Sequence, residues 1–281
     1  MMKTGSTHPD PKLLSINTAT VRQQWDLAQI IDGCARHEIR GISPWRDQVK
    51  ALGLKEAARA IRANELVVTG YCRGGMFTAN TEAGRVEARD DNRRAVDEAL
   101  ELGSQCLVLV VGGLPEGSKD LKDARSQVRD GIGELLEYAR RQRMPLAIEP
   151  LHPMYAADRA CVNTMAHAND LCDELGEGLG IALDLYHTWW DPDLEAQIKR
   201  AGKTRLLAFH ICDWLVPTRD LLLDRGMMGD GVIDLRKWRH AVEEVGYEGF
   251  HEVEIFSAEN WWQKDPNEVL ATCKARHLEF C

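Results

Sequence analysis

Four residues that can bind a metal ion stand at the ends of short apolar segments of the chain: Glu149, Asp184, His210 and Glu254. Each alone has an ordinary structural explanation, such as a salt bridge or a packing hydrogen bond. Together, three carboxylates and one imidazole suit a divalent cation and leave coordination positions for substrate oxygens. Mn²⁺ is the expected ion, and Mg²⁺, Co²⁺ or Zn²⁺ can use the same ligands.

Such a site favours proton transfer at carbon. A divalent ion that chelates a carbonyl and a neighbouring hydroxyl acidifies the shared C–H bond by stabilising an enediolate. Two carboxylates on opposite sides of such a substrate, Glu149 and Glu254, could then remove and return the proton. Return to the same carbon gives epimerisation, return to the neighbouring carbon gives isomerisation, and loss of a substituent gives elimination. The sequence leaves these three outcomes open.

The elements that must position these residues alternate along the chain. Short apolar segments predict eight strands, at residues 13–17, 39–43, 66–71, 105–111, 145–149, 180–184, 206–210 and 250–256. Apolar spacing and end signals predict a helix after each strand, including one continuous helix over residues 45–64. The helix after the first strand is expected to follow Thr20, because Val21, Trp25, Ala28 and Ile31 recur at helical spacing.

Strands that alternate with helices predict an α/β protein with parallel pairing, and eight such units suit a (β/α)8 TIM barrel of about 250 residues. An open doubly wound sheet is the alternative, but no G-x-G-x-x-G motif follows the first strand and no phosphate-binding loop occurs. Residues 1–281 are expected to form one TIM-barrel domain, with residues 1–11 as a flexible N-terminal segment. In this fold chemistry takes place at the carboxyl ends of the strands, where the candidate ligands fall.

Composition limits the partners. The chain has 281 residues, of which 44% are hydrophobic and 28% charged, as in a globular protein. Its net charge of −9 argues against a nucleic-acid partner. The eight cysteines form no C-x-x-C pair, the first dozen residues are too polar for a signal peptide, and no apolar run reaches the ~20 residues of a membrane span. A soluble, cytoplasmic protein without a membrane partner is expected.

Several motifs resemble the xylose isomerase-like TIM barrels, and within them the sugar phosphate isomerase and epimerase group. They are Ile-Glu-Pro at 148–150, Asp184 with His187, Phe-His at 209–210 before a long loop, and the G-Y-x-G-x-x-x-x-E pattern at 246–254. The similarity covers most of the chain. It implies that Glu149, Asp184, His210 and Glu254 bind one divalent metal ion and that His187 lies beside a small carbohydrate substrate. There His187 is a predicted catalytic residue that could bind a substrate hydroxyl or relay a proton. It also implies that copies of the chain pair into a homo-oligomer.

The substrate side is less defined by the sequence. Ketose epimerases of this kind carry an arginine shortly after the histidine of strand seven, where this chain has Val216, so Arg219 or Arg225 is expected to replace it. Six residues in loops after strand ends are predicted to contact substrate: Arg73, His152, Tyr155, Trp189, Trp214 and Arg219. Glu252 shares a strand face with Glu254 and is predicted to support the site from behind the metal ligands.

The predicted activity is that of a metal-dependent sugar or keto-sugar isomerase or epimerase. A lyase on the same site is the alternative, either a dehydratase or an enzyme that eliminates the aglycone of a 3-keto-glycoside. A DNA repair enzyme like endonuclease IV would need a cluster of several metal ions and a basic face, which the charge and the single strand-end histidine disfavour. A sugar-binding barrel without catalysis is disfavoured because all four ligand candidates are present.

Overall fold

The computed structural model describes residues 8–281. Its main sheet contains nine strands, all paired in parallel, in the order β3-β2-β1-β11-β8-β7-β6-β5-β4. These strands are β1 (Leu14–Asn17), β2 (Gly41–Ser43), β3 (Val67–Val68), β4 (Tyr71–Gly75), β5 (Leu107–Val110), β6 (Leu146–Ile148), β7 (Leu179–Asp184), β8 (Leu206–Ile211) and β11 (His251–Val253). A separate antiparallel pair consists of β9 (Asp213–Trp214) and β10 (Arg225–Gly226).

Strands β3 and β4 together form one strand of the barrel. They stand at opposite ends of the sheet order, yet only Thr69 and Gly70 separate them along the chain. The Thr69 N–H donates to the Ile42 carbonyl at 3.0 Å, and the Tyr71 N–H donates to the Cys106 carbonyl at 3.1 Å. This segment therefore joins the two ends of the sheet, and the predicted (β/α)8 barrel is confirmed.

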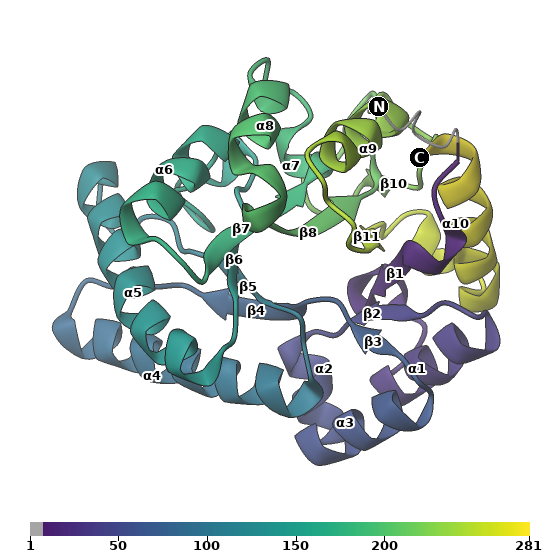
Figure 1. The fold of residues 1–281 in the computed structure, drawn as a ribbon, viewed down its shortest axis with the longest axis horizontal. Coiled ribbons are helices and arrows are strands. Elements are labelled where there is room, and N and C mark those ends of the chain that lie inside the picture. Colours follow the sequence, from purple (N-terminus) through teal and green to yellow (C-terminus); the bar gives the residue numbers. More distant parts are fainter. Residues whose placement is uncertain (1–7) are drawn as a thin grey trace.

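Helices lie around the outside of the strands (Figure 1). They are α1 (Leu27–Arg36), α2 (Arg46–Leu52), α3 (Leu54–Ala63), α4 (Glu82–Leu102), α5 (Leu121–Gln142), α6 (Met165–Leu175), α7 (Leu185–Thr188), α8 (Leu194–Arg205), α9 (Leu235–Glu244) and α10 (Pro266–Phe280). Short 3-10 helices occur at η1 (Pro11–Leu13), η2 (Thr18–Val21), η3 (Pro153–Tyr155) and η4 (Trp261–Gln263). None of the helices between residues 8 and 281 combines the length and the apolar character that a membrane span requires.

The predicted continuous helix over residues 45–64 is wrong. Gly53 adopts a φ of +96° between α2 and α3, and its N–H caps α2 by donating to the Val49 carbonyl. A left-handed backbone at this position ends one helix before the next begins, which glycine permits at little steric cost. The first helix also begins later than predicted, at Leu27, because Asp26 and Gln29 form a capping box there.

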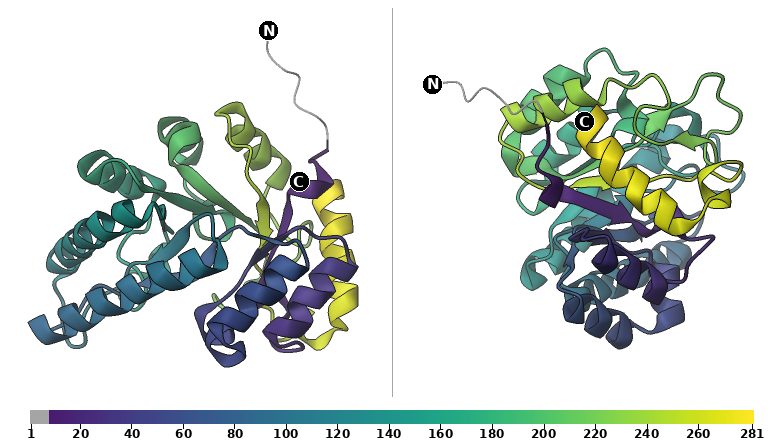
Figure 2. Two further views of the ribbon diagram at one scale, coloured as in Figure 1. Left: turned by 60° about the horizontal axis from the view of Figure 1, so that its bottom comes forward. Right: turned by 90° about the vertical axis from the view of Figure 1, so that its right-hand side faces the viewer.

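The two ends of the described chain lie close together. Figure 2 shows the C-terminal helix α10 running beside β1, and α10 contacts both η1 and α1. Residues 1–11 were predicted to form a flexible segment. Residues 1–7 of that segment lie outside the described residues. Within its remainder Pro9 is buried, and the His8 ring lies 3.0 Å from the Leu278 carbonyl oxygen. Strand β1 pairs with β11, so the first and last strands of the barrel meet.

Small residues fill the middle of the barrel and leave room for longer polar side chains. A buried cluster separate from the main core includes Ala147, Ala182 and Ala208. Each of them lies two residues before a candidate ligand, on the same face of its strand. The corresponding position before Glu254 is Glu252, which is 1% exposed. The barrel interior therefore carries three alanines and one carboxylate beneath the candidate site.

Candidate metal and substrate site

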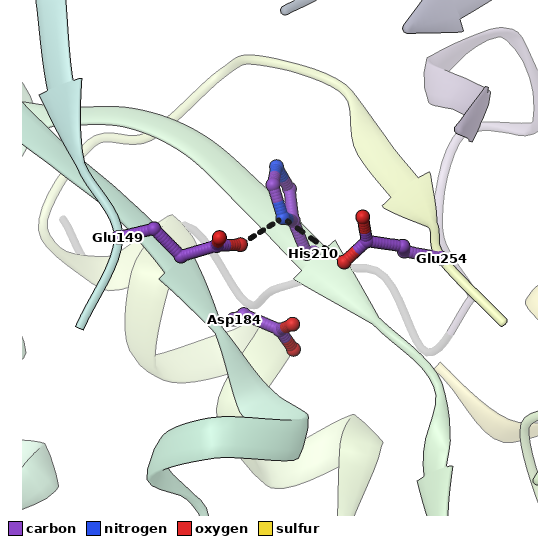
Figure 3. A group of neighbouring side chains, drawn as sticks. All are labelled: Glu149, Asp184, His210 and Glu254. Carbon is purple, nitrogen blue, oxygen red and sulfur yellow. Dashed lines mark hydrogen bonds and ion pairs between the residues drawn. The ribbon is translucent and has the colours of Figure 1, made fainter. Parts of the chain in front are cut away.

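The carboxyl ends of four neighbouring strands bring the predicted ligands together. Asp184 ends β7 and His210 lies in β8, while Glu149 and Glu254 each follow directly after a strand, β6 and β11. One ligand atom from each of these side chains lies within 4.8 Å of the others. Figure 3 shows the three carboxylates and the imidazole converging, with His210 Nδ1 3.1 Å from Glu149 Oε1 and 3.9 Å from Glu254 Oε2.

The cluster carries excess negative charge in a buried environment. Asp184 and His210 are fully buried, and Glu254 and Glu149 are only 4% and 6% exposed. Burial raises the pKa of Glu254 to about 8, and the neighbouring Glu149 and Asp184 add to that shift against Arg225 and His210. Buried carboxylates at such short separations require a positive partner. Four buried ligand atoms that converge on one point fit a divalent cation.

Each nitrogen of His210 faces a different carboxylate. Nδ1 faces Glu149, whereas Nε2 lies 3.4 Å from Oε1 of Glu252. Glu252 is itself held in place, because Asn17 Nδ2 and Thr69 Oγ1 each donate a hydrogen bond of 2.8 Å to its carboxylate. Burial opposes a charge on His210, but Glu252, Glu149 and Glu254 outweigh burial and raise its pKa well above the ordinary value. The arrangement presents Nδ1 to the cluster.

Arg225 is the functional candidate that the sequence named only as an alternative. Its guanidinium is buried, and Nη1 lies 3.1 Å from both Asp184 Oδ2 and Glu254 Oε2. The cation also stacks 4.3 Å from the ring centroid of Tyr186. The arginine reaches this position because β10, which begins with it, pairs with β9 at the start of the loop after β8. That pairing is set by tertiary contacts and has no signal in the local sequence.

His187 lies between Asp184 and the open part of the site. Burial lowers the pKa of His187 to about 3, so its ring is neutral near pH 7. Nε2 lies 3.2 Å from Arg225 Nη2, and a guanidinium can only donate, so Nε2 accepts and Nδ1 carries the proton. Nδ1 is buried and has no hydrogen-bond partner within residues 8–281. Burial also acts on Asp184 and would raise its carboxyl pKa, but the nearby positive charge, chiefly that of Arg225 with a contribution from His210, outweighs burial and lowers it.

A cavity of about 330 Å³ opens above the cluster. Of the predicted site residues, five line it: Arg73, Glu149, Tyr155, His187 and Glu254. The sequence did not single out Trp45, Asp158, Arg159 or Phe256, which line the cavity as well. Trp45 and Phe256 follow strand ends, which was the available signal. The two charged residues lie in the long loop after β6, where nothing in the sequence sets them apart.

Four residues predicted to contact substrate do not line this cavity. His152 stacks on Trp214 with ring centroids 5.2 Å apart, and Trp189 packs against Trp214 at 5.8 Å. These three side chains form an aromatic cluster. Arg219 is 60% exposed and pairs with Asp224, through Nη2 and Oδ1 at 2.5 Å. Arg225, the other arginine expected for this role, lines the cavity instead.

The fold and the site together define the class of protein. It is a (β/α)8 barrel with a buried cluster of candidate metal ligands at the carboxyl ends of its strands. The chain belongs to the xylose isomerase-like TIM barrel family, whose model matches residues 26–273. The resemblance drawn from the sequence motifs is thereby confirmed.

Curated relatives of the chain are sugar isomerases and epimerases. An inosose isomerase of Bacillus velezensis is 24% identical over 275 residues, which span 93% of this chain and 94% of that protein. An L-ribulose-5-phosphate 3-epimerase of Salmonella typhi is 24% identical over 233 residues, 82% of this chain and 76% of its own length.

Solved structures show the same fold. Protein SMc04130 of Sinorhizobium meliloti 1021 is 60% identical, with a TM-score of 0.95 over 97% of this chain and 99% of that one. The IOLI protein, solved with a bound zinc atom, is 21% identical, with a TM-score of 0.81 over 95% of this chain and 97% of that one.

Proposed function

We propose that this protein is a divalent-metal-dependent isomerase or epimerase of a small sugar or keto-sugar. The observation that carries the proposal is the convergence of four buried ligand atoms within 4.8 Å of one another beside a cavity. The sugar isomerases and epimerases among the relatives support the reaction class. The zinc atom bound to the IOLI protein supports a divalent ion in this fold.

The residues that would hold the ion are Glu149, Asp184, His210 and Glu254. A divalent cation there would supply Lewis acidity to a carbonyl and an adjacent hydroxyl of the sugar, and so make the shared C–H bond acidic. Mn²⁺ is the ion we expect in the cell, because three carboxylates and one imidazole form a predominantly oxygen ligand set. Metal analysis of the native protein tests this choice.

Glu149 and Glu254 are the proposed acid–base pair. Both line the cavity, and they approach it from strands β6 and β11, with β7 and β8 between them. A sugar bound between them would present its opposite faces to the two carboxylates. One carboxylate would take the proton from carbon and the other would return it, as an enediolate-type reaction requires.

His187 and Tyr155 are proposed to bind sugar hydroxyls. The Nδ1–H of His187 and the hydroxyl of Tyr155 are buried and lack partners within residues 8–281, although both residues line the cavity. Buried polar atoms in native proteins nearly always have hydrogen-bond partners. A polyol substrate would provide them, and its own orientation would then be fixed by two groups that do not bind the metal.

Solvent deuterium exchange tests the reaction. The Mn²⁺-loaded protein is incubated in D₂O with a panel of ketoses, and incorporation at carbon is followed by NMR and mass spectrometry. We expect exchange with at least one sugar, and a loss of about 100-fold or more in Glu149→Gln and Glu254→Gln. Glu177→Gln, which changes an exposed glutamate away from the site, is the control and is expected to keep the full rate.

A second experiment distinguishes the proposed isomerase or epimerase from the lyase alternative. A 3-keto-glycoside is added to the loaded protein and the release of its aglycone is measured by chromatography. Release of aglycone without net isomerisation of any sugar would replace the proposed reaction with an elimination on the same site. No exchange with any sugar and no release would overturn both.

A further inference from the structure

Arg73 differs from the other arginines of the described chain. Within residues 8–281 it is the one arginine that is not exposed and yet has neither an ion pair nor a hydrogen bond through its guanidinium. Arg46, by comparison, binds Asp91 and Glu98, and Arg225 binds Asp184 and Glu254. An unpaired cation that is partly removed from water costs free energy. Such a group is a candidate for binding a ligand.

No carboxylate within residues 8–281 forms an ion pair with Arg73. Arg73 was predicted to lie in a loop after the third strand, but it lies within β4, and it lines the cavity together with Trp45 and Met76. Burial is the main cause that lowers the pKa of Arg73, while Glu149 acts in the opposite direction. The Glu149 carboxylate, however, faces Nδ1 of His210 at 3.1 Å, within the ligand cluster. A divalent ion on that cluster would engage this carboxylate further.

A second guanidinium lies on the same cavity. Arg159 stacks 5.3 Å from the ring centroid of Tyr155, and its one ion pair within residues 8–281 is a contact of 3.8 Å with Asp158, whose side chain is 65% exposed. Arg159 is also close enough to lower the pKa of Arg73 by charge repulsion. Two cations that repel each other therefore share the lining of one cavity, in a chain whose net charge is −9.

We propose that the substrate carries an anionic group, a phosphate ester or a carboxylate, that Arg73 and Arg159 bind. The inference rests on the proposed function, because it assigns the rest of the sugar to the metal cluster and to His187. Guanidinium groups bind phosphate and carboxylate oxygens through charge-assisted hydrogen bonds, often two at a time. An anion between the two arginines would remove their repulsion and supply the partner that Arg73 lacks.

Calorimetric binding to the full, Mn²⁺-loaded chain tests the inference with two matched pairs of probes. One pair is L-ribulose and L-ribulose 5-phosphate, and the other is D-fructose and D-fructuronate. We expect the anionic member of at least one pair to bind about tenfold or more tightly than its neutral partner. If only the phosphate binds more tightly than its neutral partner, the anionic group is a phosphate ester. If only the uronate does so, the anionic group is a carboxylate. Equal binding within both pairs overturns the inference.

Variants show whether Arg73 is the cause. Arg73→Gln is expected to weaken the anionic probe by about 10- to 100-fold and to leave the neutral sugar within about twofold. Arg159→Gln is expected to act in the same direction, and Arg73→Lys to retain part of the preference. Arg40→Gln changes an exposed arginine before β2, at the opposite end of the barrel, and is expected to bind as the parent chain does. An unchanged preference in Arg73→Gln overturns the inference.

Folding and metal binding provide separate readouts. Arg73 has no protein partner to lose, so Arg73→Gln is expected to melt at the parent temperature or above it and to bind Mn²⁺ unchanged. If that variant fails to fold, Arg73→Lys and Arg159→Gln decide the test. Anion preference through Arg73 without deuterium exchange would overturn the proposed reaction and keep this inference. Deuterium exchange with neutral sugars and no preference for anionic probes would keep the proposed reaction and overturn this inference.

Discussion

Glu252 Oε1 lies 3.4 Å from His210 Nε2, on the side of the imidazole opposite the ligand cluster. Both side chains are buried, and the Glu252 carboxylate accepts hydrogen bonds from Asn17 and Thr69. A carboxylate in this position can accept the Nε2 proton and leave the Nδ1 lone pair free for a cation. In metal sites such a partner fixes the tautomer and the orientation of the ligand ring.

Glu252→Gln is therefore expected to weaken Mn²⁺ binding by about 10- to 100-fold without removing a metal ligand. The amide cannot offer the same negative charge to Nε2, so the ring loses its preferred tautomer. Titration calorimetry measures the affinity, and the NMR shifts of the His210 ring nitrogens report the tautomer independently of activity. Glu177→Gln is the control. Unchanged affinity and an unchanged tautomer in Glu252→Gln would remove the supporting role from this carboxylate.

Removal of metal is expected to lower stability. A ligand that binds only the folded state at 100 times its Kd stabilises it by about 2.7 kcal/mol. Adding Mn²⁺ to chelator-treated protein should therefore raise the Tm, and the rise should be lost in His210→Ala. Differential scanning calorimetry with and without EDTA measures the effect. A Tm increase of the same size in His210→Ala would place the stabilising ion elsewhere.

The barrel was predictable because its signals are local. Strands such as β5, β6 and β7 are short, mainly apolar segments, and the four candidate ligands stand at or just beyond the ends of β6, β7, β8 and β11. The break between α2 and α3 was missed because a single glycine within a helical pattern does not reveal its φ. Gly53 could have continued the helix at a cost of about 1 kcal/mol, and the backbone instead turns there.

The cavity lining was less predictable, since it depends on where long loops return. Nothing near Arg219 or Arg225 indicates that the first pairs with Asp224 and the second reaches Asp184. Which of Glu252 and Glu254 belongs to the ligand cluster likewise depends on tertiary contacts. Both point into the barrel by strand alternation, and their different partners become visible only when β8 and β1 are placed beside β11.

Arg225→Gln is expected to destabilise the metal-free protein by about 3–5 kcal/mol, because it leaves Asp184 and Glu254 buried without their shared cation. Bound Mn²⁺ should reduce this cost, since it would neutralise the same carboxylates. Urea unfolding with EDTA and with Mn²⁺ measures both values. Arg36→Gln removes an exposed pair with Asp32 and should cost no more than about 0.5 kcal/mol. A similarly small cost for Arg225→Gln would contradict the ion-pair geometry.

Acid is expected to destabilise the barrel through a buried histidine pair. His251 Nδ1 lies 2.9 Å from His277 Nε2, and both rings are 1% exposed. Burial lowers the pKa of His251 to about 3 and that of His277 to about 4. In the unfolded chain both rings would take up protons near pH 6.5. The unfolded state therefore binds more protons between about pH 6.5 and pH 4, and stability must fall as pH falls through that window.

Each ring can contribute a slope of up to about 1.4 kcal/mol per pH unit. The free energy of unfolding is measured by urea titration at several pH values, with EDTA throughout so that metal release does not contribute. His277→Gln should reduce the slope, because it removes one suppressed protonation and leaves His251 a neutral partner. His37→Gln changes a partly exposed ring and serves as the control. An identical slope in parent and His277→Gln would mean that the pair is protonated without cost in the folded protein.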